Sequence, residues 1–155
     1  MIIFTLIFLT LDICSKLIVS KYLNINESIQ IIKKVLNITH VRNTGVAWSL
    51  LNDQTPLVLI ISIIVIISII IYIRKNYPKS LGEKISYSMI LGGAIGNFIN
   101  RMIYGYVTDF IDISLFGYNY PVFNLADTFI VIGVILLIII SWRCEHVRNK
   151  SNRKW

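Results

Sequence analysis

PLVLIISIIVIISIIIYI, residues 56–73, is the stretch that decides the class of this protein. It contains no charged residue, and as a helix its 18 residues would rise roughly 27 Å at about 1.5 Å per residue. That length is close to the roughly 30 Å thickness of the hydrocarbon core of a bilayer. We therefore predict that this segment is a membrane-spanning helix.

The rest of the 155-residue chain is also apolar. Hydrophobic residues make up 55% of it and charged residues only 15%, with a mean hydropathy of +0.71. A soluble domain of this size cannot bury so much apolar surface, so the excess is expected to face lipid. The net charge of +7 arises from basic residues at the ends of apolar runs. This pattern indicates membrane topology rather than a nucleic-acid-binding surface.

Three further segments are predicted to cross the membrane, although each carries polar residues: about 1–22, with Asp12 and Lys16; 85–104, with Asn97, Asn100 and Arg101; and 121–142, with Asn124 and Asp127. The N-terminal run lacks a basic leader and a small-residue cleavage site, so it is interpreted as a retained span. The predicted fold is a membrane all-α protein of one domain over 1–155. It is a four-transmembrane-helix bundle in which GxxxG spacing at Gly92 and Gly96 permits close helix contact.

The connections between these spans differ in charge. Residues 74–84 and 143–155 hold nine Lys and Arg residues, whereas 23–54 and 105–120 hold three. By the positive-inside rule, both termini are predicted to be cytoplasmic. Residues 105–120 are interpreted as a short outer loop. Partly alternating β-branched residues predict a small extracytoplasmic β-rich segment over about 24–54.

Cysteine and histidine positions predict neither a metal site nor a cofactor. Cys14 and Cys144 lie at opposite ends of the chain without CxxC spacing. His40 and His146 have no carboxylate at helical spacing that would form a metal-binding face.

The acids within or beside the predicted spans are the main candidates for chemistry, because a charge at mid-bilayer costs roughly 2.5 to 3.5 kcal/mol. Asp109 follows the third span and Asp127 lies early in the fourth. A short loop between the two spans would therefore place both carboxylates at the same depth in the membrane. Two adjacent carboxylates in a partly dry site cannot both ionise easily, so one keeps a proton. The other can then activate a water molecule, as in an aspartyl protease.

Spacing alone leaves other interpretations of these acids open. Asp127 could cap the fourth helix or pair with Arg101, and Asp109 could be a loop acid. Asp112, three residues after Asp109, could take its place in the pair. A small transporter whose buried acids relay protons would need similar residues.

Other polar residues are predicted to support this site. Asn124 lies three residues before Asp127, so its amide can orient a carboxylate. Asp12 and Lys16 form an i, i+4 pair that could simply neutralise itself. A Ser/Lys hydrolase is disfavoured because Ser15 and Lys16 are neighbours that point apart on a helix. On the third span, three polar residues follow i, i+3, i+4 spacing: Asn97, Asn100 and Arg101.

Five blocks follow one another along the chain: DICSK at 12–16, RNTGVAWSLL at 42–51, GGAIGNFINR at 92–101, VTDFID at 107–112 and FNLAD at 123–127. Together they closely resemble the lipoprotein signal peptidase family, the bacterial type II signal peptidases, over essentially the whole chain. The resemblance implies an intramembrane aspartyl endopeptidase of the bacterial cytoplasmic membrane. It implies removal of the signal peptide from prolipoproteins, just before a cysteine that carries a diacylglyceryl group.

The same resemblance implies roles for individual residues. The catalytic acids are expected to be Asp109 and Asp127, with Asp112 secondary, and the site near the outer face. The expected partners are lipid-modified prolipoprotein and membrane lipids, without nucleic acid or cofactor, and the chain is expected to act as a monomer. Supporting or substrate-contacting roles are implied for Asp12, Lys16, Asn43, Gly45, Asn97, Asn100, Arg101 and Asn124.

Four positions depart from the family pattern. Asn100 stands where the family commonly has Asp, so an expected charge pair with Arg101 is lost. Val46 and Trp48 replace a small residue and Phe, and Thr108 replaces a common Val. Trp48 is expected to help clamp the lipid-bearing substrate at the membrane surface, because an amphipathic aromatic suits that depth.

Overall fold

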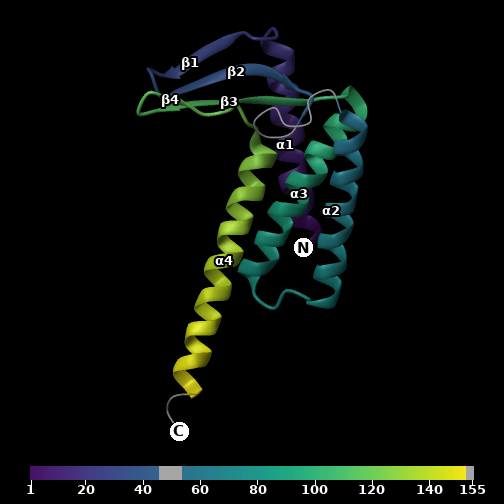
Figure 1. Ribbon diagram of the computed structural model, residues 1–155, viewed down its shortest axis with the longest axis vertical. Helices are drawn as coiled ribbons and strands as arrows, with labels where there is room; N and C mark the ends of the chain where they lie inside the picture. Colours follow the sequence, from purple (N-terminus) through teal and green to yellow (C-terminus); the bar gives the residue numbers. More distant parts are fainter. Residues whose placement is uncertain (46–53, 153–155) are drawn as a thin grey trace.

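The structure, a computed structural model, describes residues 1–45 and 54–152, with side-chain surroundings as far as residue 143. A sheet lies across one end of a group of helices, and α4 extends well beyond the others at the opposite end (Figure 1). The elements in chain order are α1 (Ile2–Tyr22), β1 (Ser28–Ile32), β2 (Leu36–Asn43), α2 (Thr55–Lys75), α3 (Leu81–Tyr104), β3 (Val107–Leu115), β4 (Tyr118–Asn119) and α4 (Leu125–Asn152).

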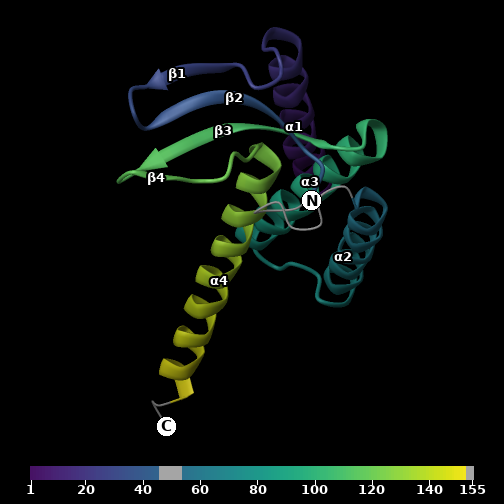
Figure 2. The ribbon, with the colours of Figure 1, turned by 45° about the horizontal axis from the view of Figure 1, so that its top comes forward.

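The predicted four-transmembrane-helix bundle is wrong. In the described part of the chain, three helical segments are long and apolar enough to cross a membrane: Ile2–Tyr22, Thr55–Lys75 and Leu125–Arg143. The central helix α3 is not among them, although it has 24 residues. It packs against α1, α2 and α4, so its side chains meet protein more than lipid (Figures 1 and 2). An enclosed helix can carry polar residues and glycines that a lipid-facing helix avoids.

The sheet is larger than predicted. Residues 105–120 are not a plain loop, because they contain β3 and β4. These strands join the expected β-rich segment in one antiparallel sheet of order β1-β2-β3-β4. Asn43 pairs with Val107 and Val41 pairs with Asp109, with an irregularity in β2 between Ile38 and Val41. The sheet therefore places the end of β2 beside the start of β3.

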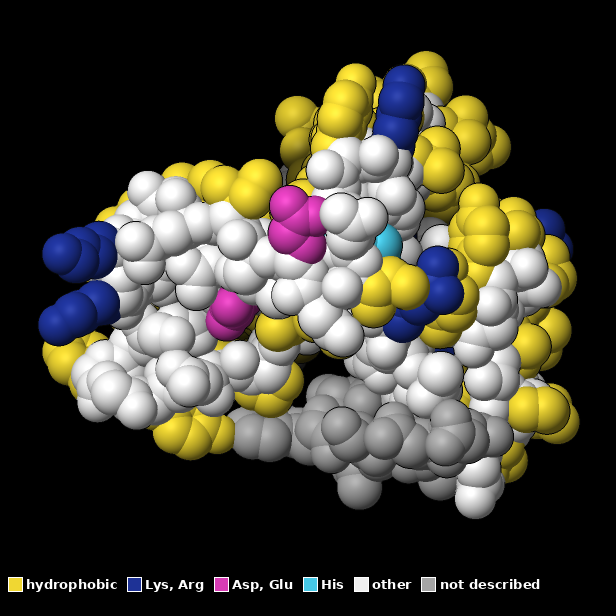
Figure 3. All heavy atoms as spheres, turned by 90° about the horizontal axis from the view of Figure 1, so that it is seen from above, with side chains coloured by type: hydrophobic (Ala, Val, Ile, Leu, Met, Phe, Trp, Pro, Cys, Tyr) yellow, Lys and Arg dark blue, Asp and Glu magenta, His cyan; other side chains and the backbone are white. Residues whose placement is uncertain are grey.

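A small apolar core joins the sheet to the helices. Val19 and Leu23 at the end of α1 pack with Phe110 of β3, and Leu125 of α4 packs against them. Because Phe110 follows Asp109 directly, this core also fixes the backbone next to that carboxylate. Seen from the sheet side, backbone, uncharged polar groups and acidic side chains lie in the central part, and hydrophobic side chains lie mainly along the edges (Figure 3). That distribution fits a sheet that faces water and is bordered by lipid.

The last helix begins later than predicted, at Leu125 rather than near Pro121. Phe123 stays extended because it forms an isolated bridge with Ile111 of β3. Asn124 then acts as the helix N-cap, since its Oδ1 accepts the N–H of Asp127 (3.1 Å). The bridge and the cap together place Asp127 in the first turn of α4, directly below the sheet.

Glycines in α3 allow the close packing that the GxxxG spacing predicts. An added Cβ at Gly92 would lie 2.9 Å from Cβ of Phe8, and one at Gly96 would overlap Asp12, so both glycines face α1. Gly93 faces α4 instead, where an added Cβ would overlap the backbone carbonyl of Ala126. The three glycines hold α1 and α4 close to α3 at the level of the polar residues.

Replacing Gly93 with Ala is expected to destabilise the protein by about 1 to 3 kcal/mol, because the clashing atom belongs to the backbone and cannot rotate away. Gly82→Ala is the matched control on the same helix. There the added Cβ meets Cδ1 of Ile140 at 2.9 Å, the movable end of a side chain, and Ala favours the helix by up to about 1 kcal/mol. Thermal unfolding in detergent checks both variants. Equal melting temperatures for the two would contradict this account.

Candidate active site

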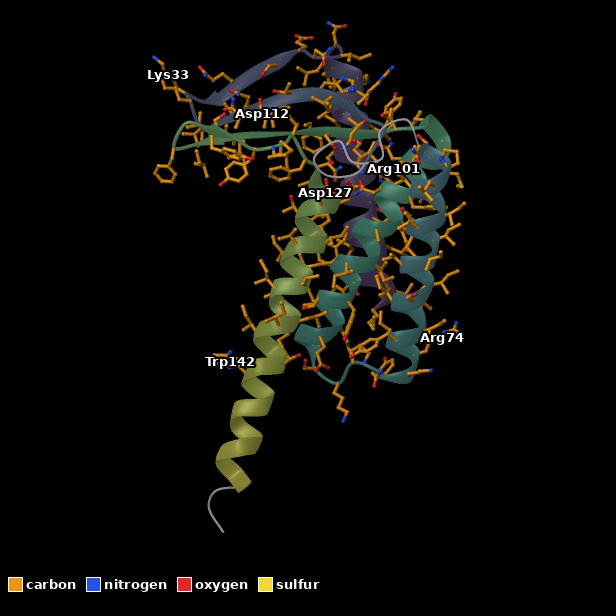
Figure 4. The ribbon with its side chains drawn as sticks, viewed as in Figure 1. Lys33, Arg74, Arg101, Asp112, Asp127 and Trp142 are labelled. Atoms are coloured by element: carbon orange, nitrogen blue, oxygen red, sulfur yellow. The ribbon has the colours of Figure 1, made fainter. Side chains whose placement is uncertain are left out.

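Asp109 of β3 and Asp127 of α4 line one cavity of about 870 Å³ beneath the sheet. Four of the predicted supporting residues line the same cavity: Asn43, Asn97, Arg101 and Asn124. Figure 4 shows Asp127 and Arg101 where the helices meet the sheet, and Asp112 farther out along the sheet. The structure therefore brings together residues from β2, α3, β3 and the start of α4.

Asp109 is almost completely buried, with 2% of its surface exposed. Its Oδ2 accepts a hydrogen bond from Asn43 Nδ2 (2.8 Å), and its Oδ1 accepts one from Asn124 Nδ2 (2.6 Å). Burial, and next the negative charge of Asp127, raise the pKa of Asp109 to about 6, although the two amides and Lys16 act in the opposite direction. Asp109 therefore holds a proton more readily than an ordinary carboxyl group.

Asp127 is held by amides from two elements. Its Oδ1 accepts from Asn97 Nδ2 (2.8 Å), and its Oδ2 accepts from the backbone N–H of Asn124 (3.3 Å). With the return bond from its own N–H to Asn124, this forms a reciprocal cap at the start of α4. Asp127 thus takes part in helix capping, as one sequence interpretation suggested, and also lines the cavity.

Two asparagines connect the two carboxylates. Asn124 has no exposed surface, and its Nδ2 donates both to Asp109 and to Asn97 Oδ1 (3.2 Å). Asn97 in turn donates to Asp127. Asn97 and Asn124 also bond to each other, and Asn97 accepts from Lys16. The two amides are therefore held in place, and they fix the orientation of the Asp109 carboxylate relative to that of Asp127.

Asp12 and Lys16 extend this network to α1. Lys16 Nζ donates to Asp12 Oδ2 and to Asn97 Oδ1, each at 2.7 Å. Asp12 Oδ1 accepts the backbone N–H of Ala126 (2.9 Å) in the first turn of α4. The pair therefore does more than neutralise itself, because it ties α1 to both helices that carry the site.

Arg101 lines the cavity and reaches the segment that follows β2. Its Nη2 donates to the carbonyl of Gly45 (2.6 Å), and Gly45 N–H donates to Asn43 Oδ1 (3.0 Å). Among the described residues, Asp12 and Lys16 form the one ion pair, so Arg101 does not form the salt bridge with Asp127 that sequence spacing allowed. Arg101 instead positions the segment that contains Asn43.

Comparison with known proteins identifies the family. The family model of signal peptidase (SPase) II matches residues 4–143. The chain belongs to the signal peptidase II family. Curated lipoprotein signal peptidases of Staphylococcus aureus strains JH9 and Newman are each 38% identical to it over 143 residues, which cover 92% of this chain and 85% of theirs.

Solved structures agree with this family assignment. A bacterial membrane enzyme solved by the in meso method at 2.3 Å superposes with a TM-score of 0.84 at 37% identity, covering 99% of this chain and 90% of that one. A second bacterial membrane enzyme, solved by the same method at 1.9 Å, gives a TM-score of 0.81 at 38% identity, covering 90% of each chain. As a signal peptidase II, the chain is a membrane peptidase.

Asn100 and Asp112 both lie away from the cavity that Asp109 and Asp127 line. Asn100 lines a smaller pocket of about 190 Å³ between α1 and α3. Asp112 accepts hydrogen bonds from Thr39 Oγ1 (2.8 Å) and Asn37 Nδ2 (3.3 Å) on the sheet. Side chains alternate along a strand, so an acid three residues after Asp109 projects from the other face. Asp112 is therefore not positioned to replace Asp109 beside Asp127.

Several cavity residues were missed by sequence reasoning. Arg42, Tyr120 and Phe123 line the cavity, with Ile130 and Val131 of α4. Arg42 packs over the ring of Tyr106, 4.5 Å from its centroid. Sequence reasoning could have found Tyr120 and Phe123 from the period-two pattern of residues 107–115. That pattern predicts a strand, and the chain that follows such a strand would bring these two aromatic residues under the sheet. Val46 and Trp48 lie outside the described residues, as do all residues 46–53 of the predicted segment 24–54.

Replacing Asp127 with Asn is expected to lower the pKa of Asp109 from about 6, because it removes a charge that raises it. The pKa should stay above its usual value near 3.9, since burial is the larger cause. Carbon-13 NMR of the labelled aspartate carboxyls measures this shift. An unchanged midpoint would show that the two carboxylates do not interact.

The raised pKa of Asp109 also has a consequence for folding. Protonation favours the folded state, so the stability that Asp109 contributes is complete below its unfolded pKa and is lost as pH rises through about 6. Asp109→Asn should flatten the fall in melting temperature between about pH 4 and pH 6.

Proposed function

We propose that this chain is an aspartic endopeptidase that removes the signal peptide from prolipoproteins, with Asp109 and Asp127 as its catalytic pair. Membership of the signal peptidase II family supports the reaction, and one observation supports the catalytic type. The two carboxylates, from β3 and α4, line one cavity and share Asn124 as a hydrogen-bond partner. Among the described residues, no group of three His, Cys, Asp or Glu side chains could hold a metal ion.

In the proposed reaction, Asp127 is the base and Asp109 carries the proton. Asp127 takes a proton from a water molecule held between the carboxylates, and the water oxygen bonds to the scissile carbonyl carbon. Asp109 gives its proton to the carbonyl oxygen, which yields a neutral gem-diol. When the C–N bond breaks, the amine nitrogen takes the proton from Asp127, and one hydroxyl of the diol returns a proton to Asp109.

The surrounding residues have supporting roles in this proposal. Asn97 and Asn124 keep the carboxylates oriented through the cycle, so little reorganisation is needed as charge moves. The buried positive charge of Lys16 offsets part of the negative charge of the pair. Arg101 holds the carbonyl of Gly45 and lines the cavity, where its guanidinium can contact substrate carbonyl groups.

The position of the cavity fits a lipid-bearing substrate. Polar side chains line it beneath the sheet, and Ile130 and Val131 line it farther along α4, a helix apolar enough to face lipid. A cut just before a diacylglyceryl-modified cysteine would place the peptide at the polar part and the lipid along the apolar part. The charge distribution supports an arrangement in which this end of the helices lies on the outer side of the bacterial cytoplasmic membrane and both termini lie inside.

One chain carries both carboxylates, so we expect a monomer, folded as one domain, to be active. The test is to incubate purified full-length protein in liposomes with a diacylglyceryl-modified prolipoprotein and with the same precursor lacking the lipid. Cleavage before the modified cysteine, with little or none of the unmodified precursor, is the expected result. Failure to cut the lipidated precursor, combined with proton-coupled flux into the liposomes, would instead favour a transporter.

A further inference from the structure

The backbone on both sides of Asp109 is anchored by acceptors outside the sheet. The N–H of Thr108 donates to Asn100 Oδ1 (2.8 Å), and the N–H of Phe110 donates to the carbonyl of Phe123 (2.9 Å). Asp109 lies between these two peptide groups. The bond to Phe123 comes from the segment that leads to Asp127, whereas the bond to Asn100 comes from α3.

Asn100 reaches β3 across a very short connection. Only Gly105 and Tyr106 separate α3 from β3, and Gly105 adopts a left-handed conformation (φ 78°) that ends the helix. Asn100 lies in the last turns of α3 with 9% of its surface exposed. Its side chain accepts a peptide N–H that would otherwise be buried without a partner, at a cost comparable to a lost hydrogen bond.

The anchored strand separates two cavities. Val107 and Asp109 line the main cavity, whereas Thr108 lines the smaller pocket on the other side together with Asn100 and Ser20. Side chains alternate along a strand, so a rotation of the Thr108 peptide would turn the side chain of Asp109 as well. The bond from Thr108 to Asn100 opposes that rotation.

We propose that Asn100 is a positioning residue for Asp109, which acts by accepting the N–H of Thr108 and so directs the Asp109 carboxylate into the main cavity. The inference rests on the proposed catalytic role of Asp109. It also accounts for a departure from the family resemblance. An Asp at this position would offer the same acceptor oxygen, so the positioning contact needs the oxygen and not the charge.

The neutral amide has a physical advantage at this place in the fold. Asn100 lies near the C-terminal end of α3, where the helix dipole disfavours an added negative charge. An Asp there would also add another negative charge near the pair. Asn100→Asp is expected to keep the hydrogen bond from the N–H of Thr108. Asn100→Leu keeps a side chain of similar size but removes the oxygen that accepts this bond.

The test compares these two variants in the lipidated-precursor assay, with Ser88→Ala as control. Ser88 is a buried polar residue of the same helix, and its hydroxyl donates to the carbonyl of Met1, far from the site. We expect Asn100→Leu to lower kcat roughly ten- to hundredfold with KM nearly unchanged. Asn100→Asp should keep most of kcat, and Ser88→Ala should resemble wild type.

A second measurement separates positioning from a general loss of structure. Asn100→Leu should shift the NMR titration of the Asp109 carboxyl, and Ser88→Ala should not. If Asn100→Leu does not fold, Asn100→Ala leaves room for water and should still lower kcat with KM unchanged. Wild-type kcat in Asn100→Leu or Asn100→Ala, or equal losses in Asn100→Asp and Asn100→Leu, would overturn the proposal. Full activity of Asp109→Asn would instead overturn the proposed function itself.

Discussion

Asp127→Asn and Asp109→Asn are each expected to lower kcat for cleavage of the lipidated precursor by roughly 10³-fold or more, because each removes one partner in proton transfer. The amide is nearly the size of the carboxylate, so the fold should persist. In Asp109→Asn the amide can neither hold nor deliver the proton that the carbonyl oxygen needs. In Asp127→Asn it cannot take a proton from water.

The matched control for both variants is Asp112→Asn. Asp112 lies on the same strand as Asp109, but its carboxylate bonds to Thr39 and Asn37 on the sheet. It should keep wild-type kcat within about twofold, since exposed or partly exposed surface groups contribute little. Initial rates with purified protein measure all three variants, and melting temperatures show that each is folded. Near-wild-type cleavage by Asp109→Asn or Asp127→Asn would remove that residue from the catalytic pair.

The preference for Asp109 over Asp112 shows what a sequence alone can provide. Topology places both acids at the outer end of the predicted spans, and only the family resemblance separates them. The segment VTDFIDISL was interpreted as part of a loop, so its strand periodicity was not used. Once these residues are known to form β3, a separation of three is enough to place the two acids on opposite faces.

The error in the fold has a related cause. Hydropathy describes a segment by itself, whereas the environment of α3 depends on the three helices that surround it. Its glycines allow that close approach, and its polar residues face partners rather than lipid, so the composition of α3 is that of an enclosed helix. The apolar helical segments Thr55–Lys75 and Leu125–Arg143 face less protein, and for them composition was sufficient.

The site was predictable as a set of residues but not as a network. The blocks pick out three asparagines without indicating which acid each one contacts. Asn43 and Asn124 donate to Asp109, and Asn97 donates to Asp127. Likewise, the i, i+4 spacing predicts that Asp12 contacts Lys16, but not that Lys16 also reaches Asn97. Contacts between residues far apart in the chain depend on how the helices cross, and local spacing does not encode this.

Lys16→Met is expected to destabilise the protein by about 3 to 5 kcal/mol, because it leaves the buried carboxylate of Asp12 without its counter-ion. Lys16 is 2% exposed and Asp12 has no exposed surface, so water cannot replace the lost partner easily. Lys21→Met is the control, since Lys21 lies on the same helix with an exposed side chain. Thermal and denaturant unfolding in detergent should separate the two variants clearly.

The double variant Asp12→Asn with Lys16→Met separates stability from catalysis. Replacing both charges removes the unpaired carboxylate, so much of the lost stability should return. Cleavage should not recover equally, because Asn97 still lacks its bond to Lys16. Loss of the Lys16 charge should also raise the pKa of Asp109 above about 6, opposite to the effect of Asp127→Asn. If stability and cleavage recover together, Lys16 contributes only to stability. If cleavage stays low in a stable protein, the contact between Lys16 and Asn97 contributes to catalysis.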